Sequence, residues 1–387
     1  MNSPSLGTSG NIYAYTSSVL IVSNGHGEDA VGMALAAEIG SVAQLAAFPL
    51  AGAGAAYRGI PMLEPRRQLP SGGFGLRGSW RAIWADLCAG IVSLWLGQRA
   101  TLRQQRGRHH LVVAIGDVYC LWMAARAGGP LVFIATAKSE YNEPHRWLER
   151  MLIRRHAAAV FTRDQATADA LRRAGLPATY AGNPLMDTIG LTGTLVSPDA
   201  TGPTVTILPG SRADAYKNLQ PLLHLCAAVA RRVQANFLCA LASSIDVDRA
   251  RTSVEAAGWQ ATGDLLKREG ATVRLTRAFG DAVQAADVVV GLAGTANEQA
   301  AGLGKPVVTF AGPGSQITPH FVRLQKRLLG EALVTGQTWE DAANSVIRLL
   351  NDPKERAARG TAGRERMGGT GGVARIAETI LALLRER

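Results

Sequence analysis

Short apolar runs alternate with amphipathic, helix-like segments along most of the chain. Alternation of this kind is typical of βα units and parallel sheets. In the first half, the runs predicted as strands are 19–23, 111–115, 131–136 and 158–162. In the second half they are 205–208, 236–240, 272–275, 288–290 and 307–310. We therefore expect an α/β protein that binds its ligands at the carboxyl ends of the strands.

The length of 387 residues favours two domains. A segment rich in Gly, Thr, Ser and Pro runs from residue 188 to 203 and is the best candidate for a boundary. We expect two doubly wound, Rossmann-like domains facing a central cleft, with domain limits at 1–187 and 188–372. A last helix is predicted in 373–387, after a Gly-rich break, and it can pack back on the amino-terminal domain.

Composition narrows the class of protein. The hydrophobic fraction of 47% and the charged fraction of 18% are those of a globular protein. Residues 1–187 carry 18 Lys+Arg and 12 Asp+Glu (+6), and the remainder carries 23 and 18 (+5), which together make the net charge of +11. Nucleic-acid binders usually concentrate their charge, so we expect no nucleic acid and instead an anionic substrate or an anionic membrane surface.

The four cysteines are far apart and form no metal-binding spacing with histidines, which predicts reduced thiols and no metal site. The amino-terminal segment lacks the order of a secretory signal, and no apolar run reaches the roughly 18 residues needed to cross a bilayer. We expect a cytoplasmic protein, either soluble or peripheral on the inner face of the cytoplasmic membrane.

One segment near the carboxyl end predicts a phosphate site. The apolar run 288–290 passes through two glycines into a helix that holds Glu298, so Gly294 and Thr295 lie at the start of that helix. Free N–H groups and the helix dipole favour an anion there. Glu298, one turn further on, can accept hydrogen bonds from a ribose. The alternative is an ordinary helix start with a solvated glutamate.

A second segment is expected at the same edge of the sheet. The strand at 205–208 ends in Pro-Gly-Ser-Arg, which places Gly210, Ser211 and Arg212 in a turn. Arginine can bind two phosphate oxygens at once. Taken alone the motif is more often just a turn, but the two segments are expected to face the same crevice and together are far more specific for a phosphate-bearing ligand than either is alone.

In the first half, strand 19–23 ends in a glycine-rich loop that contains Asn24, Gly25, His26 and Glu28. His26 or Glu28 can act as a general base or contact a sugar hydroxyl, and His26 can equally cap or pack. Strand 111–115 is followed by Asp117, which is either a catalytic carboxylate or a helix cap.

Two further segments bear on the acceptor. Strand 131–136 leads into a dense polar cluster in which Lys138 and Ser139 can contact an anion or a sugar. Between Trp80 and Trp95, apolar residues that include Trp84 recur at helical spacing with arginines at both ends. Such a helix suits a lipid headgroup region or an acyl-chain groove, or it is simply buried.

Five motifs in this order carry a resemblance to a known family. They are Ser-Asn-Gly-His-Gly-Glu-Asp at 23–29, Ile-Gly-Asp at 115–117, Gly-Asn-Pro-Leu-Met-Asp at 182–187, Leu-Pro-Gly-Ser-Arg at 208–212 and Gly-Thr-Ala-Asn-Glu-Gln at 294–299. The chain resembles lipid A disaccharide synthase, and more closely the lipid-A-disaccharide-synthase-related proteins, from about residue 18 to its end. The resemblance implies a GT-B glycosyltransferase that is inverting and metal-independent, with a UDP-sugar donor in the carboxyl-terminal domain and a lipid acceptor in the amino-terminal one.

The resemblance also implies roles for single residues. Arg212 would hold the donor diphosphate and Glu298 the ribose. Asp117 stands where the synthase has a catalytic carboxylate and is the first candidate for the base. His26 is the second, because related lipid-sugar transferases carry a histidine in that loop. The synthase's polar loop after the donor helix is replaced here by 312–320.

We therefore expect transfer of a GlcNAc-type sugar or a hexose from a UDP-sugar to a lipid-linked acceptor, as in lipid A disaccharide or related glycolipid synthesis. The residues expected to contact the acceptor are Asn24, Gly25, Glu28, Lys138, Ser139 and Trp84. A UDP-sugar 2-epimerase and a non-catalytic nucleotide-sugar or membrane-binding protein are the alternatives. The sugar, the lipid and the oligomeric state stay open.

Overall fold

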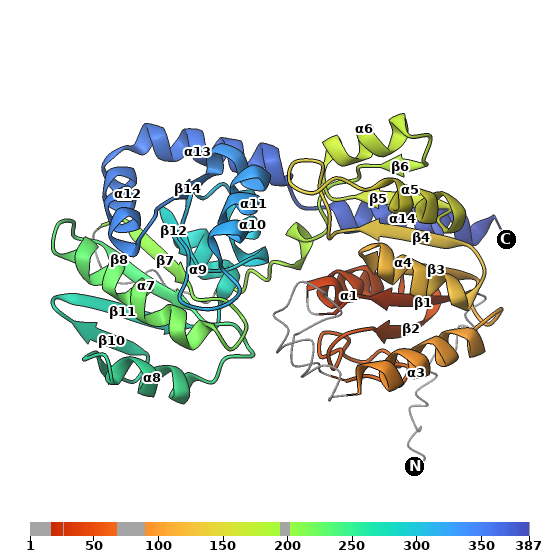
Figure 1. The fold of residues 1–387 in the computed structure, drawn as a ribbon, viewed down its shortest axis with the longest axis horizontal. Helices are drawn as coiled ribbons and strands as arrows, with labels where there is room; N and C mark the ends of the chain where they lie inside the picture. Colours follow the sequence, from red (N-terminus) through yellow and green to blue (C-terminus); the bar gives the residue numbers. More distant parts are fainter. Residues whose placement is uncertain (1–16, 26, 68–89, 194–201, 387) are drawn as a thin grey trace, which may run out of the picture. The chain divides into compact units, whose positions relative to one another are not determined.

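The computed structural model describes residues 17–25, 27–67, 90–193 and 202–386. Its strands form two sheets that are mainly parallel and are accompanied by helices (Figure 1). Contacts divide the chain into two compact units. The first is Met1–Phe133 with His156–Ala158 and Ala377–Arg387, and the second is Ile134–Arg155 with Ala159–Ile376. The α/β class is confirmed, while the boundary at 187/188 and the packing of 373–387 stay predictions.

The first sheet has the strand order β2-β1-β3-β4-β5-β6. Its strands are β1 (Ser17–Ser23), β2 (Ala43–Pro49), β3 (Leu111–Gly116), β4 (Leu131–Ala135), β5 (Ala159–Thr162) and β6 (Ala178–Thr179). The helices between them are α1 (Gly27–Ile39), α3 (Ile91–Gln104), α4 (Val118–Ala124), α5 (Trp147–His156) and α6 (Gln165–Arg173). β1 pairs in parallel with β2 and β3, and every residue of β3 is buried. Burial of both faces explains why these strands are continuous apolar runs in the sequence.

The second sheet has the order β14-β13-β12-β7-β8-β11-β10-β9. Its strands are β7 (Thr204–Leu208), β8 (Asn236–Ala240), β9 (Gln260–Thr262), β10 (Leu265–Arg268), β11 (Ala271–Thr276), β12 (Val288–Gly291), β13 (Val307–Thr309) and β14 (Leu333–Thr335). The helices along this part of the chain are α7 (Ala215–Ala230), α8 (Val247–Glu255), α9 (Phe279–Ala285), α10 (Thr295–Gly302), α11 (Pro319–Leu329), α12 (Trp339–Asn351) and α13 (Pro353–Met367). The last helix, α14 (Gly372–Arg385), falls mostly in the first unit.

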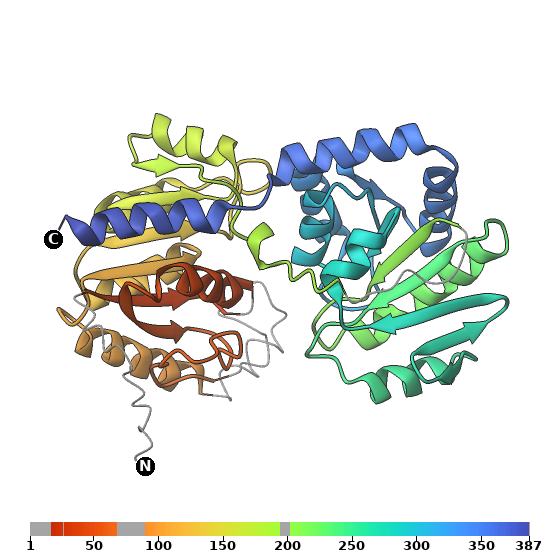
Figure 2. The ribbon, with the colours of Figure 1, turned by 180° about the vertical axis from the view of Figure 1, so that it is seen from behind.

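Helices cover both faces of the second sheet (Figures 1 and 2). The alternation along β12 shows the two layers, since Val288 and Val290 pack into one apolar cluster and Val289 into another. The first cluster is built largely on α7, α8 and α12, and the second on α9, α10 and α11. In a parallel sheet the carboxyl ends of all strands lie at the same edge. The loops that follow them can therefore form a site there.

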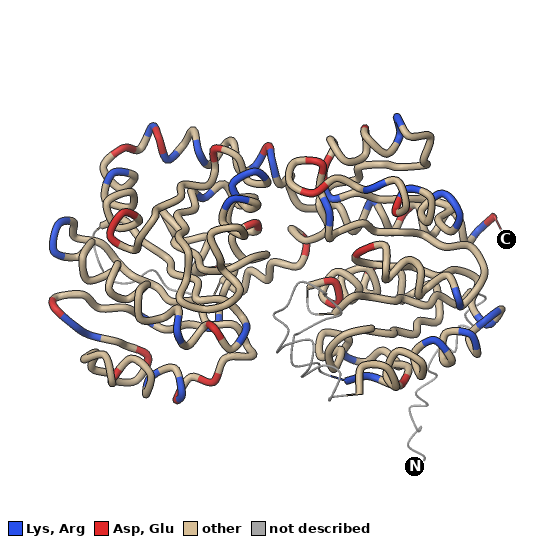
Figure 3. The backbone as a smooth tube through the Cα atoms, viewed as in Figure 1, with Lys and Arg blue, Asp and Glu red and all other residues tan. Residues whose placement is uncertain are grey.

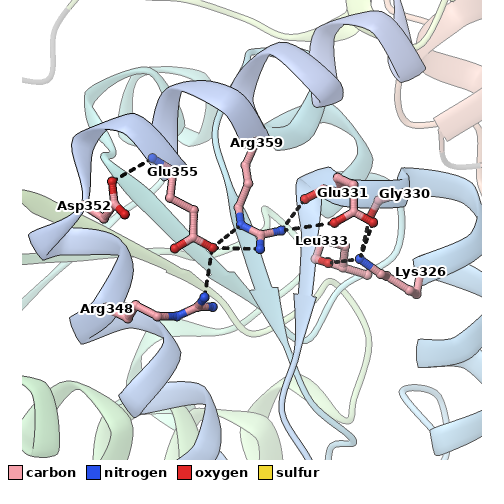
Figure 4. Close-up of polar contacts among 8 residues, drawn as sticks. All are labelled: Lys326, Gly330, Glu331, Leu333, Arg348, Asp352, Glu355 and Arg359. Atoms are coloured by element: carbon pink, nitrogen blue, oxygen red, sulfur yellow. Dashed lines mark hydrogen bonds and ion pairs between the residues drawn. The ribbon is translucent and has the colours of Figure 1, made fainter.

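A chain of ion pairs ties α13 to the elements beside it (Figure 4). Glu355 pairs with Arg348 of α12 at 3.0 Å and with Arg359 at 2.8 Å. Arg359 continues to Glu331 at 3.8 Å, and the Lys326 ammonium donates to the Leu333 carbonyl at 2.8 Å. The network fixes the helices around β14, the outermost strand of the parallel part of the sheet.

Every strand predicted from the sequence is present. The sequence analysis does not predict β2, β6, β9, β10 or β14. β9 and β10 also break the expected parallel order, because they pair antiparallel with each other and with β11. The predicted helix from Trp80 through Trp95 is not continuous, because Gly90 has a φ of 78° and α3 begins at Ile91; residues 80–89 lie outside the described residues.

Candidate functional site

Two loops of the second unit meet at the carboxyl ends of β7 and β12. These strands are parallel neighbours, and the Leu292 amide donates to the Leu208 carbonyl at 2.9 Å. Gly210 turns the chain after β7 with φ of 101°, and a Cβ on it would lie 3.1 Å from the Leu292 carbonyl oxygen. Position 210 favours glycine, because the positive φ and the nearby carbonyl oxygen both disfavour a side chain. The structure thus brings together the Pro-Gly-Ser-Arg turn and the start of α10, as predicted from the sequence.

The side chains and amides at this edge suit an anion. Ser211, Arg212 and Thr295 are exposed. Gly294 is the N-cap residue of α10 and makes no side-chain cap, and the Asn297 amide donates to the Gly294 carbonyl at 3.0 Å, so the amides of Thr295 and Ala296 are the first-turn donors suited to a ligand. The positive end of the helix dipole adds to the attraction. The roles assigned to these residues stay predictions.

A buried amide network fixes the loop that leads from β12 to α10. The Asn297 side chain donates to the Gly291 carbonyl and to the Gln325 side-chain oxygen, each at 3.0 Å. Gln325, from α11, in turn donates to the Ala293 carbonyl at 3.0 Å and to the Gly294 carbonyl at 3.3 Å. Asn297 is 0% and Gln325 3% exposed. Two buried amides therefore set the position of the carbonyls just before the helix start.

Gly291 belongs to the same network. The buried Thr309 hydroxyl donates to the Gly291 carbonyl at 2.7 Å, and a Cβ on Gly291 would lie only 1.7 Å from the Asn297 side-chain oxygen. Gln325, Asn297 and Thr309 are not predicted as site residues from the sequence. The one indication in the sequence is Gln325, a polar amide among the positions at which α11 faces the core.

Glu298 already has a partner within its own unit. Its carboxylate pairs with the guanidinium of Arg163 at 2.6 Å, and Arg163 also donates to the Thr136 carbonyl at 3.1 Å. Both charged side chains are largely buried: 6% of the Arg163 side chain and 14% of the Glu298 side chain is exposed. A ribose that bonds to Glu298 would therefore share the carboxylate with Arg163. Arg163 is not among the residues predicted from the sequence, although it directly follows β5.

A cavity of about 540 Å³ opens beside the end of β13. Its lining is mostly apolar and aromatic; it includes Phe310, Pro313, His224 and Trp339, with Lys217 as the charged member. Gly312, also in the lining, lies against Asn218, whose amide donates to the Pro209 carbonyl. The cavity thus borders the Pro-Gly-Ser-Arg turn and has the size of a small-molecule pocket.

In the first unit, the ends of β1 and β3 lie side by side. The Asn24 amide donates to the Ile115 carbonyl at 3.1 Å. Gly116 has φ of 141°, and a Cβ on it would lie 2.8 Å from the Asn24 side chain. Gly25 has φ of 114° and faces the Ala51 carbonyl. The structure therefore brings the glycine-rich loop and the segment before Asp117 together.

Asp117 caps α4. Its carboxylate accepts from the Cys120 amide at 3.0 Å, and the residue is only partly buried. The cap that the sequence left open is thus present, and a role as base stays a prediction. Glu28 lies in the first turn of α1 and is partly exposed. His26 and Trp84 lie outside the described residues.

A buried chain of hydroxyls supports the first turn of α1. The Tyr57 hydroxyl donates to Ser23 Oγ at 2.8 Å, and Ser23 donates to the Asp29 carboxylate at 2.6 Å. Burial, and then the charge of Asp29, raise the pKa of Tyr57 well above its usual value. A Cβ on Gly32 would clash with the Tyr57 hydroxyl at 2.1 Å. The sequence analysis misses this support, because nothing in the sequence connects Tyr57 to residues 23–29.

The polar cluster after β4 is held by contacts within its unit. The Lys138 ammonium pairs with Glu149 at 2.8 Å and with Glu143 at 3.5 Å. Ser139 is 1% exposed, and its hydroxyl accepts from the Tyr141 amide at 3.2 Å. The acceptor contacts assigned to Lys138 and Ser139 stay predictions, and each would require these internal contacts to be shared.

Within the described ranges, no three His, Cys, Asp or Glu side chains are grouped so that they could hold a metal ion. The expected metal independence stays a prediction. No helix of the described chain combines the length and apolar character needed to cross a bilayer.

Solved structures establish the class of the fold. The glycotransferase of kitacinnamycin matches with a TM-score of 0.63 at 16% identity, covering 95% of this chain and 99% of that chain. Acinetobacter baumannii MurG matches with a TM-score of 0.54 at 14% identity over 96% and 100%. The UDP-GlcNAc 2-epimerase of Neisseria meningitidis, bound to UDP-GlcNAc, matches with 0.58 at 13% over 96% and 100%. The protein has the GT-B fold.

Relatives found by sequence similarity indicate a narrower class of protein than the fold does. Lipid-A-disaccharide synthase of Thiobacillus denitrificans is 29% identical over 289 residues, or 68% of this chain and 74% of that one. The synthase of Cupriavidus pinatubonensis is 31% identical over 207 residues, which is 46% of this chain and 48% of the relative. No protein-family model matches the chain. The resemblance to lipid-A-disaccharide synthases is thus confirmed, and at the level of the family it supports a glycosyltransferase.

Proposed function

We propose that the protein transfers a sugar from a UDP-sugar to a lipid-borne hydroxyl group, with inversion at the anomeric carbon. The observation that carries the proposal is the meeting of the Pro-Gly-Ser-Arg turn with the start of α10 at the ends of β7 and β12. Sequence similarity to lipid-A-disaccharide synthases supports the reaction class.

The donor diphosphate lies against Arg212 and the amides at Thr295 in this proposal. Charge builds up on the leaving UDP as the glycosidic bond breaks, and a guanidinium with preorganised N–H groups offsets it. Glu298 receives the ribose while Arg163 holds its carboxylate in place. The cavity lined by Phe310 and Trp339 takes the base, since its size and apolar lining suit a planar ring.

The acceptor proton goes to Asp117 or to His26. Asp117 is bonded to the Cys120 amide, and a half-buried carboxylate with one such bond can still accept a proton. The lipid acceptor is drawn from an anionic membrane surface, for which the net charge of +11 is suitable.

A donor screen tests the first half of the proposal. Thermal unfolding is measured with UDP, UDP-GlcNAc, UDP-Glc, UDP-Gal and a GDP-sugar. A ligand at 100 times its dissociation constant stabilises by about 2.7 kcal/mol. We expect a shift with UDP and one UDP-sugar, and no shift with any uridine nucleotide would remove the basis of the proposal.

A 2-epimerase is the second candidate, because GT-B epimerases share the fold. The two reactions are separated by incubation with UDP-GlcNAc, with and without a lipid extract. Consumption of the donor only when lipid is present, with a glycolipid product, is expected for the transferase. Conversion of UDP-GlcNAc to its 2-epimer without lipid would identify an epimerase, and binding without turnover in either case would indicate a non-catalytic protein.

A further inference from the structure

Helix α5 exposes an apolar face. Trp147 is 72% exposed, and Leu148 and Met151 are each 49% exposed. The three positions share one side of the helix, and Ile153 on the other side is buried. No other helix in the described part of the chain presents three large apolar side chains to solvent. A tryptophan exposed to this extent beside two other exposed apolar side chains indicates a binding surface.

Arginines surround this face. Residues 146–156 contain four arginines and one glutamate, which gives a net charge of +3 (4 − 1). Arg146, Arg154 and Arg155 are exposed, and Arg154 and Arg155 continue the apolar side one turn further along the helix. Figure 3 shows basic positions, all of them arginine, recurring along α5. Glu149 is already paired with Lys138, and Arg150 lies 4.0 Å from the Glu140 carboxylate, so Arg146, Arg154 and Arg155 are the arginines that carry the charge of this face.

The end of α6 extends the basic surface. The Arg154 guanidinium donates to the Ala174 carbonyl, which fixes the carboxyl end of α6 beside α5. Arg172 and Arg173 lie in the last turn of α6 and are exposed; Arg172 pairs with Asp169, so Arg173 supplies the additional charge. The surface therefore combines an apolar centre at the start of α5 with positive charge around it and beyond it.

We propose that this face of α5 docks on an anionic phospholipid surface. Tryptophan, leucine and methionine can enter the headgroup boundary, while arginine side chains extend along the surface to lipid phosphates. Charge complementarity selects the occupant, because a protein partner would need a strongly acidic groove whereas an anionic leaflet supplies negative charge everywhere.

The docking face is joined directly to the residues expected to contact the acceptor. Glu149 of α5 bonds to the Lys138 ammonium and accepts from the Arg146 amide at 2.8 Å, and Lys138 precedes Ser139 in the loop after β4. Docking would hold this loop at the lipid surface. The biological role of docking rests on the proposed function, because it would bring the protein to a lipid acceptor. Membrane binding itself needs no sugar nucleotide and is tested separately.

Co-sedimentation with vesicles tests the docking surface. The full-length protein is mixed with phosphatidylglycerol–phosphatidylcholine vesicles or with phosphatidylcholine vesicles alone, without nucleotide. We expect binding to the anionic vesicles that weakens as salt is raised. The combined change Trp147→Ser, Leu148→Ser and Met151→Ser should lower the partition coefficient at least tenfold. Arg146→Gln with Arg155→Gln should lower it about 25-fold, at about fivefold for each arginine near the surface.

Matched controls locate the effect. Leu191→Ser removes a side chain that is 59% exposed outside α5, and Val92→Ser with Leu96→Ser removes two exposed apolar side chains of α3. Both controls should bind vesicles like the unchanged protein, and all variants should keep its thermal unfolding midpoint. Loss of binding in the α3 variant but not in the α5 variant would overturn the proposal. So would α5 variants that alter only the oligomeric state in sedimentation velocity, because the face would then join two copies of the chain.

Discussion

Gln325 is expected to control the donor loop although it does not reach the proposed ligand. In Gln325→Leu the Ala293 carbonyl loses its bond at 3.0 Å, and the Asn297 amide loses one of its two acceptors. Each buried polar group left without a partner costs about 1–3 kcal/mol, partly offset here by the apolar leucine. We expect the free energy of unfolding to fall by about 2 kcal/mol, and the unfolding midpoint to fall by about 4–8 °C for a unit of this size.

The Gln325→Leu replacement is also expected to weaken binding of UDP by the loop that precedes α10. Once the carbonyls before α10 are no longer held, the first-turn amides are less well aimed at a phosphate, so the dissociation constant of UDP should rise about tenfold. Calorimetric titration is done at 15 °C, well below the unfolding midpoint. The control is Gln284→Leu, the same replacement at an exposed position of α9. A Gln325→Leu variant with unfolding energy within about 0.5 kcal/mol of the unchanged protein and an equal UDP affinity would refute the reasoning.

Three further predictions address the base, the cavity and pH. Asp117→Asn should keep the cap on α4 and the stability, because asparagine caps as well as aspartate, yet lower turnover about 100-fold or more if Asp117 is the base. Steady-state kinetics with unchanged turnover would instead assign Asp117 to capping alone. Trp339→Ala should weaken UDP binding but leave inorganic phosphate binding unchanged, as read by calorimetry; equal losses for both ligands would contradict the base pocket. Burial lowers the pKa of His145 from 6.5 to about 4, so the unfolded chain takes up the proton first as pH falls, and stability is lost between about pH 6.5 and 4. The loss from pH 7 to 5 is about 2 kcal/mol in urea unfolding, and His145→Gln should abolish that part of the slope.

Much of the fold could be predicted from the sequence because its central strands are buried on both faces. β3 and β12 are apolar without interruption, and such runs bounded by glycine or polar residues have few other interpretations. β2 is rich in alanine and begins a few residues after a helix of similar composition, so its period gives no signal. β9 and β10 are short and partly polar strands at one end of the sheet, with β9 at the edge, and their pairing is set by the turn between them.

The site could be predicted as far as it follows from strand ends. Arg212 and Thr295 lie at the same edge because both follow parallel strands, which the alternation of strands and helices predicts; that β7 and β12 are direct neighbours is seen only in the structure. Gln325 and Tyr57 do not follow from strand ends, and Arg163, although it directly follows β5, gives no indication in the sequence of its partner Glu298. Each acts through a contact between residues that are 28, 34 and 135 positions apart, and only the packed structure brings them together.

Equilibrium binding of UDP to the unchanged protein and to Arg212→Ala tests the central claim most directly. Arg232→Ala is the control, an exposed arginine just before β8 and therefore at the amino-terminal edge of the sheet. We predict that UDP binds the unchanged protein and the control equally, and that Arg212→Ala weakens binding at least tenfold, as loss of a charge-assisted contact of about 1.5–3 kcal/mol requires. Equal UDP affinity in all three proteins, or no binding of UDP at all, would contradict the account.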